Sequence, residues 1–171
     1  MKTEKKLSFS KALNWFLTAL VAGLFLVRIP QWWALYQEEG RTVAPFEVQS
    51  ILKPQTLPIP SKKGIYVFWA TWCGPCTIEL KRLNEAVQKG ELPAEAIHAI
   101  SVGEDPELVF AEAKKRSYGF QVYADPSSRS LGSVKISGTP TLYHINEAGQ
   151  TEYSTMGISP LLVFKAKNFL N

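Results

Sequence analysis

The chain of 171 residues contains two cysteines, and both lie in the sequence Cys73-Gly74-Pro75-Cys76. An apolar, strand-like run precedes the pair, and a segment with helical periodicity follows it. Two thiols at positions i and i+3 of a helix start can close into a small disulfide ring and open again. This spacing therefore indicates a redox-active pair.

The helix start also assigns different roles to the two thiols. A helix N-terminus carries unpaired N–H groups and the positive end of the helix dipole, so it stabilises a thiolate. We expect Cys73 to be the exposed nucleophile with a lowered pKa, and Cys76 to be the shielded resolving thiol. Pro75 suits the first helical turn, where its missing N–H is not needed.

A structural disulfide or half of a zinc site is the alternative to a redox pair. A structural zinc ion takes four ligands. The other candidate ligands are His98 and His144, and each lies in an apolar, strand-like run. We therefore expect no metal site, and we expect both histidines to be hydrogen-bonded strand residues without a catalytic role.

The N-terminal region has the composition of a membrane anchor. Four lysines occur within residues 1–11, residues 12–27 carry no charge, and Arg28 follows. The uncharged segment is slightly shorter than the roughly 20 residues of a membrane span, but Arg28 can snorkel and neighbouring tryptophans can extend the span. We predict a cytoplasmic basic N-terminus over residues 1–11 and a transmembrane anchor over residues 12–36.

A cleaved signal peptide is the alternative to an anchor, although bulky residues follow the apolar segment instead of a small-x-small cleavage site. Both interpretations export the rest of the chain, and the anchor makes it a single-pass inner-membrane protein facing the periplasm. The net charge is +4. Residues 1–28 hold five of the 19 basic and one of the 15 acidic residues, so the remainder is neutral. We therefore expect no nucleic-acid partner.

The exported part predicts one α/β domain. Residues 37–55 are expected to be a tether and the start of the domain, because Gly40, Pro45 and Pro54 interrupt regular structure. Residues 43–171 are enough for one domain with a single core. The order of the elements predicts a three-layer α/β fold with a mixed sheet. We expect strands at 46–50 (a sheet edge), 65–70, 97–102, 121–124, 141–145 and 151–156, and helices at 73–89, 105–117, 125–134 and 159–170.

Two motifs resemble a known family. The run 68–76, which ends in the two cysteines, and the later sequence Gly138-Thr139-Pro140-Thr141 resemble the thioredoxin superfamily. With the predicted anchor and the segment 101–131, the chain is similar to the TlpA/ResA branch of membrane-anchored thiol–disulfide oxidoreductases. The resemblance covers about residues 43–171. It implies a thioredoxin fold with the additional strand and helix of that branch.

The resemblance also implies roles for individual residues. Cys73 would be the attacking cysteine and Cys76 the resolving one, with Trp72 beside them as an apolar contact for partners. Pro140 would be a cis-proline opposite the pair, although an ordinary trans turn proline is the alternative. A cis X-Pro bond would leave the backbone of Thr139 free to pair with an extended partner segment. Phe68 and Trp69 are expected to lie in the core.

One position departs from thioredoxin itself, which has a buried Asp six residues before its first cysteine. Val67 stands there in this chain. The ResA-like branch carries a Glu three residues after its second cysteine, and Glu79 matches it. By spacing, Glu79 lies near the cysteine face of the helix, where a partly buried carboxylate would have a raised pKa and could exchange protons with Cys76. A solvated Glu79 that pairs with Arg82 is the alternative.

Together these features predict an extracytoplasmic thiol–disulfide oxidoreductase that reduces disulfides of exported proteins without a bound cofactor. The resemblance implies a membrane electron donor of the DsbD/CcdA type and includes cytochrome c biogenesis among the family's tasks. The Gly-Pro dipeptide is that of thioredoxin, which favours reduction. A disulfide-forming oxidase and a Cu(I)-binding metallochaperone that uses the same thiols are the alternatives.

Overall fold

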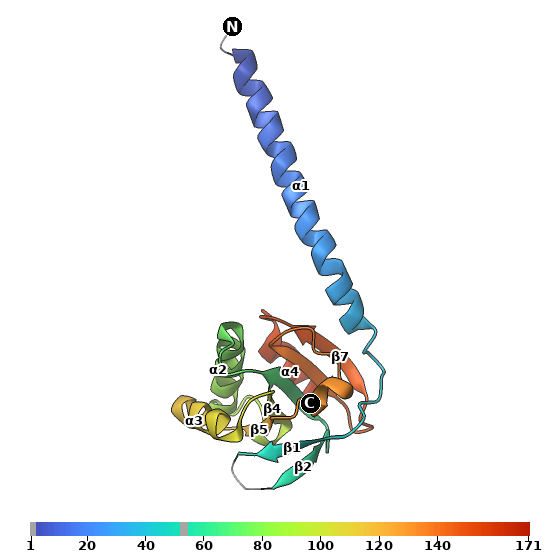
Figure 1. Ribbon diagram of the computed structural model, residues 1–171, viewed down its shortest axis with the longest axis vertical. Coiled ribbons are helices and arrows are strands. Elements are labelled where there is room, and N and C mark those ends of the chain that lie inside the picture. The colour runs from blue at the N-terminus through green and yellow to red at the C-terminus, as the bar shows by residue number, and fades with distance from the viewer. Residues whose placement is uncertain (1–2, 52–54) are drawn as a thin grey trace. The chain divides into compact units, whose positions relative to one another are not determined.

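The computed structural model describes residues 3–51 and 55–171. The chain divides into two compact units, with the boundary between Ala34 and Leu35. The first unit is formed by one long helix, α1 (Thr3–Tyr36) (Figure 1). Of the residues used in the predictions above, Pro54 and one of the four N-terminal lysines, Lys2, lie outside the described residues, as do the side chains of the lysines Lys5 and Lys6 and of Arg28.

The apolar side chains of α1 are exposed wherever the structure describes them. They face all directions around the helix and include Leu13, Trp15, Phe16, Leu17, Leu20, Val21, Leu24, Leu26 and Trp33. Within the part of the chain that is described, no helix holds a stretch long and apolar enough to cross a membrane.

The second unit is built on one mixed sheet, as the sequence predicted, and this sheet has seven strands, one more than expected. Its strands lie in the order β2-β1-β5-β4-β3-β6-β7. Strands β3, β4 and β5 are parallel to one another, and the remaining pairs are antiparallel. The carboxyl ends of the parallel strands therefore meet at one end of the sheet. The strands are β1 (Phe46–Ser50), β2 (Thr56–Ile59), β3 (Gly64–Trp69), β4 (Ile97–Val102), β5 (Gln121–Asp125), β6 (Thr141–Ile145) and β7 (Thr151–Met156).

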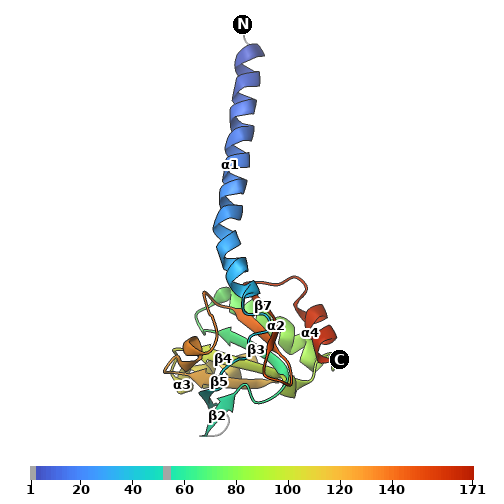
Figure 2. The same ribbon diagram turned by 90° about the vertical axis from the view of Figure 1, so that its right-hand side faces the viewer.

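The helices α2 (Gly74–Gln88), α3 (Pro106–Arg116) and α4 (Leu162–Leu170) all contribute to one core cluster. Leu83 of α2, Val109 of α3 and Ala166 of α4 are buried in this cluster together with residues of β3, β4 and β5. Right-handed β-α-β crossovers explain why α2 and α3 share this face. Helices α2 and α4 also contact each other, and Figure 2 shows them side by side.

The opposite face of the sheet has its own aromatic core, which includes Tyr66, Phe68 and Tyr143. Val134 packs into this core, and Ile136 packs against it. Both follow the short 3₁₀ helix η2 (Arg129–Gly132). The third layer is therefore a 3₁₀ turn with irregular chain and contains no α-helix among the described residues.

The predicted helix over 125–134 is wrong, and only η2 forms there. The carboxylate of Asp125, at the end of β5, accepts hydrogen bonds from the backbone N–H groups of Arg129 and Ser130, each at 2.9 Å. Ser128, which directly precedes Arg129, has a left-handed φ of 51°. These contacts close a tight turn, so no regular helix can start at Asp125.

The predicted edge position of β1 is also wrong, because β2 pairs outside it. The sequence did not reveal β2, since Pro58 lies inside the strand and Pro60 directly follows it. Proline is tolerated in an edge strand, where its missing N–H faces outward. The Ile59–Pro60 peptide bond is cis, which was not predicted.

Part of the segment expected to be a tether is packed onto the domain. Gly40 donates its N–H to the Thr151 carbonyl at 2.7 Å, and Val43 donates to the Gly149 carbonyl at 2.9 Å. Thr151 donates in return to the Arg41 carbonyl at 3.0 Å. These bonds attach residues 40–43 to the β6–β7 hairpin before β1 begins.

Candidate active site

Cys73 and Cys76 form a disulfide at the N-terminus of α2, with an S–S distance of 2.06 Å and a Cα–Cα distance of 5.2 Å. Cys73 is the N-cap residue, and Pro75 lies in the first helical turn. The Cys76 N–H points at the Cys73 Sγ, with the two atoms 3.2 Å apart. A thiolate at Cys73 would therefore receive a backbone N–H as well as the positive end of the helix dipole.

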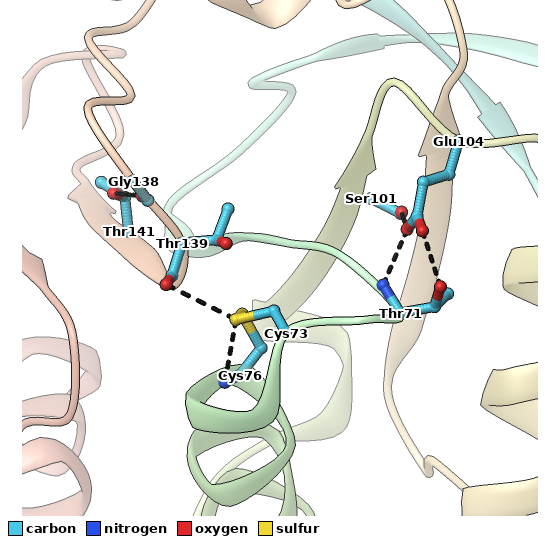
Figure 3. Close-up of a disulfide and its surroundings, with 8 residues drawn as sticks. All are labelled: Thr71, Cys73, Cys76, Ser101, Glu104, Gly138, Thr139 and Thr141. Carbon is cyan, nitrogen blue, oxygen red and sulfur yellow. Dashed lines mark hydrogen bonds between the residues drawn. A yellow bond between two sulfur atoms is a disulfide. The ribbon is translucent and has the colours of Figure 1, made fainter.

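Cys73 is less exposed than the sequence predicted. Cys73 is 4% exposed and Cys76 is 0% exposed. The two sulfurs cover each other, and the Thr139 carbonyl oxygen lies 3.5 Å from the Cys73 Sγ on the other side (Figure 3). Cys73 is nevertheless the more exposed residue of the pair, which agrees with the expected order of attack, and that order stays a prediction.

The Thr139–Pro140 bond is cis, as the sequence resemblance predicted. Figure 3 shows the Thr139 carbonyl directed at the Cys73 Sγ, to which a reduced Cys73 can donate its S–H. The neighbouring chain is fixed by two hydrogen bonds, from the Thr141 Oγ to the Gly138 carbonyl at 2.6 Å and from the Gly157 N–H to the Pro140 carbonyl at 2.8 Å.

The aromatic residues before the pair divide into two kinds. Trp72 is 78% exposed beside Cys73, which suits an apolar contact for partners, although that contact stays a prediction. Phe68 and Trp69 are buried in the core, as expected. Val67, at the position of the missing Asp, is also fully buried.

Glu79 is 0% exposed, so the alternative of a solvated side chain is wrong. It does pair with Arg82, whose guanidinium lies 3.3 Å from both carboxylate oxygens, and it accepts the Ser159 N–H. Burial raises the pKa of Glu79, against the lowering effects of the Ser159 N–H and the Arg82 charge. The direction of this shift agrees with the sequence prediction, and proton exchange with Cys76 remains a prediction.

Arg82 extends this contact to the chain between β7 and α4. Its guanidinium donates to the Ser159 carbonyl at 2.6 Å and to the Pro160 carbonyl at 2.9 Å. Glu79 and Arg82 therefore fasten residues 159–160 to α2, close behind the bond from Gly157 to the cis-proline loop.

Glu104 was missed by the sequence analysis. It follows β4, is 8% exposed, and accepts hydrogen bonds from the Thr71 N–H, the Thr71 hydroxyl and the Ser101 hydroxyl (Figure 3). Its position after a buried parallel strand, at the same end of the sheet as the cysteines, was the one signal that could have identified it.

The two histidines lie in the core strands, as predicted. His98 stacks between Tyr66 and Tyr123, and burial lowers its pKa to about 4. His144 stacks on Tyr153 with the two ring centroids 3.8 Å apart, and burial lowers the pKa of His144 to about 3. The Nδ1 of His98 lies 3.4 Å from the Tyr123 hydroxyl, so the expected hydrogen bonding is confirmed for that nitrogen. Within the described residues, the Nε2 of His98 and both ring nitrogens of His144 find no partner at hydrogen-bond geometry, so the expectation is wrong for His144.

Relatives of the chain carry names of thiol–disulfide enzymes. Thiol-disulfide oxidoreductase ResA of Geobacillus kaustophilus is 28% identical over 96 residues, which are 56% of this chain and 55% of ResA. The match thus spans about half the length of that relative. Sporulation thiol-disulfide oxidoreductase A of Bacillus subtilis is 22% identical over 126 residues, 71% of this chain and 76% of the relative.

Solved structures share the fold. The crystal structure of StoA from Bacillus subtilis aligns with a TM-score of 0.61 at 22% identity, covering 75% of this chain and 97% of StoA. A thio-disulfide isomerase from Thermus thermophilus aligns with a TM-score of 0.61 at 22% identity, covering 77% and 95%. These likenesses establish a thioredoxin-like α/β fold. The model of the AhpC/TSA family matches residues 46–154, which is more than half of the chain, so this protein belongs to the AhpC/TSA family of thioredoxin-like proteins.

Proposed function

We propose that this protein is an extracytoplasmic thiol–disulfide oxidoreductase that reduces disulfides in exported proteins. The observation that carries the proposal is the Cys73–Cys76 disulfide at the N-terminus of α2, with the Cys73 Sγ facing the Thr139 carbonyl. The names of the relatives ResA and sporulation thiol-disulfide oxidoreductase A support this reaction class.

The reaction starts from the reduced pair. The Cys73 thiolate attacks one sulfur of the target disulfide, which forms a Cys73–target disulfide and releases the first target thiolate. Cys76 then loses its proton and attacks the Cys73 Sγ, which forms the Cys73–Cys76 bond and releases the second target thiolate. Two electrons pass from the pair to the target, and each released thiolate takes up one proton.

Glu79 is placed on α2 to serve the second attack. It lies three residues after Cys76 in the helix, and its raised pKa makes it able to hold or release a proton closer to neutral pH than an exposed carboxylate can. We propose that it accepts the Cys76 proton, directly or through water. A dithiol donor of the DsbD/CcdA type in the membrane would then return two electrons to the oxidised pair.

We further propose that α1 anchors the protein in the bilayer with the domain outside the cytoplasm. Residues 12–27 carry no charge, and the described apolar side chains of α1 are exposed on all sides, as lipid contact requires. The lysines of residues 1–11 favour a cytoplasmic N-terminus. Alkaline carbonate extraction tests this: the full chain should stay with the membrane, and a Leu20→Arg/Leu24→Arg variant should be released. A full chain that is extracted like the variant would refute the anchor.

The test of the reaction is the reduction potential of the Cys73–Cys76 pair in the full chain, measured in detergent against thiol buffers of known potential. A value near or below roughly −270 mV, as in thioredoxin, supports electron donation to disulfides. A value near roughly −120 mV, as in DsbA, would instead make the protein a disulfide-forming oxidase. Stoichiometric Cu(I) binding without turnover of a protein disulfide would favour a metallochaperone.

A further inference from the structure

Glu104 connects two parts of the chain that are distant in sequence. Its Oε2 accepts the Thr71 N–H at 2.8 Å, and its Oε1 accepts the Thr71 hydroxyl at 2.6 Å. The Ser101 hydroxyl, at the end of β4, donates to the Oε2 as well. Figure 3 shows the carboxylate between the Ser101 and Thr71 side chains. One buried side chain thus holds the end of β4 against the chain that enters α2.

Thr71 lies inside the turn that sets the position of Cys73. The Cys73 N–H donates to the Ala70 carbonyl at 3.1 Å, which closes a turn with Thr71 and Trp72 at its centre. Because Glu104 holds both the backbone and the hydroxyl of Thr71, the turn cannot rotate without breaking two hydrogen bonds to the same carboxylate. The direction of the Cys73 Sγ and the exposure of Trp72 both depend on this turn.

The donors around Glu104 are all neutral. Among the described residues, no Lys, Arg or His forms an ion pair with it. A carboxyl group is costly to bury without a cation, so its three hydrogen bonds must offset much of that cost. A carboxylate can accept hydrogen bonds on both of its oxygens, so it can satisfy one N–H and two hydroxyl donors.

We infer that Glu104 is a positioning residue for the cysteine pair: by fixing Thr71, it holds Cys73 as the N-cap of α2 and directs its sulfur at the Thr139 carbonyl. The hydrogen bonds of Glu104 go to Thr71 and Ser101 and not to either cysteine, so it acts through the turn. The inference deepens the proposed function and rests on it for its consequence, which is a faster attack on target disulfides.

Three substitutions separate geometry from charge. Glu104→Gln keeps the length of the side chain: its oxygen can accept from the Thr71 N–H and Ser101, and its NH2 can donate to the Thr71 hydroxyl. Glu104→Asp keeps the charge but shortens the reach by one methylene. Glu104→Ala removes both the charge and the hydrogen-bonding groups. Asp125→Ala is the matched control, because it also removes a buried carboxylate that holds a loop, but one that contacts Arg129 and Ser130.

The primary readout is the pH profile of alkylation of the reduced Cys73 by iodoacetamide, with the modified site identified by mass spectrometry. Positioning predicts that Glu104→Ala and Glu104→Asp shift the midpoint upward, because Cys73 leaves the helix N-terminus, whereas Glu104→Gln and Asp125→Ala keep it. If the negative charge of Glu104 acted directly on Cys73, its loss in Glu104→Ala and Glu104→Gln would lower the midpoint of Cys73 alkylation. That result, or an unchanged midpoint in folded Glu104→Ala, would overturn the inference.

The second readout is the rate of reduction of a protein disulfide, at a temperature where circular dichroism shows every variant folded. We expect Glu104→Ala and Glu104→Asp to be roughly ten- to a hundredfold slower, as for displaced reacting groups, and Glu104→Gln to retain most of the rate. Equal slowing by Asp125→Ala would overturn the inference. A wild-type chain that reduces no disulfide would instead refute the proposed function, and the alkylation profiles would still test Glu104.

Discussion

Two buried glutamates, Glu79 and Glu104, follow the cysteine pair in the sequence, and they have different hydrogen-bond partners. Glu79, on α2 after the pair, has a cationic partner in Arg82 and accepts one backbone N–H. Glu104 has no ion pair among the described residues and accepts three neutral donors. Burial raises the pKa of Glu79.

The difference suggests that one glutamate serves proton transfer and the other serves geometry. Glu79 accepts hydrogen bonds from Arg82 and from the Ser159 N–H, yet burial outweighs both and raises its pKa. Glu104 ties the turn before Cys73 to β4, and Glu79 with Arg82 ties residues 159–160 to α2. A buried carboxylate therefore holds the turn before the pair, and another holds the helix after it.

The largest effect is expected from the cysteines, which carry the exchange that both glutamates are proposed to support. Cys73→Ser should abolish reduction of protein disulfides, because it removes the attacking sulfur. Cys76→Ser should instead accumulate mixed disulfides through Cys73, because nothing then resolves them. Non-reducing electrophoresis with mass spectrometry detects these species. If neither variant behaves in this way, neither glutamate can serve a CxxC exchange.

The next effect tests Glu104 as a geometric support. Glu104→Ala leaves the half-buried Thr71 N–H and hydroxyl without their partner and should lower the free energy of unfolding by about 2–3 kcal/mol. Glu104→Gln should cost less than half of that, since an amide can satisfy the same three groups. Urea unfolding monitored by circular dichroism measures both. An equal loss for Gln and Ala would show that charge, and not hydrogen-bond geometry, makes Glu104 stabilising.

A smaller effect is expected from the cation beside Glu79. Arg82→Ala removes two hydrogen bonds to residues 159–160 and leaves Glu79 without its opposite charge. We expect the free energy of unfolding to fall by about 1–2 kcal/mol and the pKa of Glu79 to rise further. Arg82→Lys, which keeps the charge, is the control for the pKa. The pKa of Glu79 is measured from the pH dependence of its carboxyl carbon signal in NMR. An unchanged Glu79 pKa in Arg82→Ala would contradict an effect of the Arg82 charge on this carboxyl group.

The smallest effect is the pH dependence of stability that Glu79 contributes. Its pKa is higher in the folded than in the unfolded chain, so its contribution is fully present below the unfolded pKa and is lost as pH rises through the folded pKa. Glu79→Gln cannot ionise. The variant should therefore gain stability relative to wild type as pH increases across that interval, by about 1.4 kcal/mol for each unit of pKa difference. Parallel stability curves of the two proteins would remove the distinction between the glutamates.

Much of the site could be predicted from local sequence. The spacing of Cys73 and Cys76, with Pro75 in the first turn, determines a helix start with two facing thiols. Helical spacing also placed Glu79 on a covered face, and the Thr139-Pro140 sequence indicated the cis bond through its family resemblance. These features depend on residues that are neighbours along the chain.

The remaining features depend on contacts across the fold. Glu104 meets Thr71 from 33 residues away, and Ser159 meets Glu79 from 80 residues away, so no local pattern could reveal either pair. The low exposure of Cys73 likewise depends on Thr139, 66 residues later. The sequence by itself determined where the reactive pair lies and that a helix begins there. The tertiary structure decided which buried side chains hold and cover the pair, because those contacts form only when the sheet brings the ends of β3 and β4 and the cis-proline loop together.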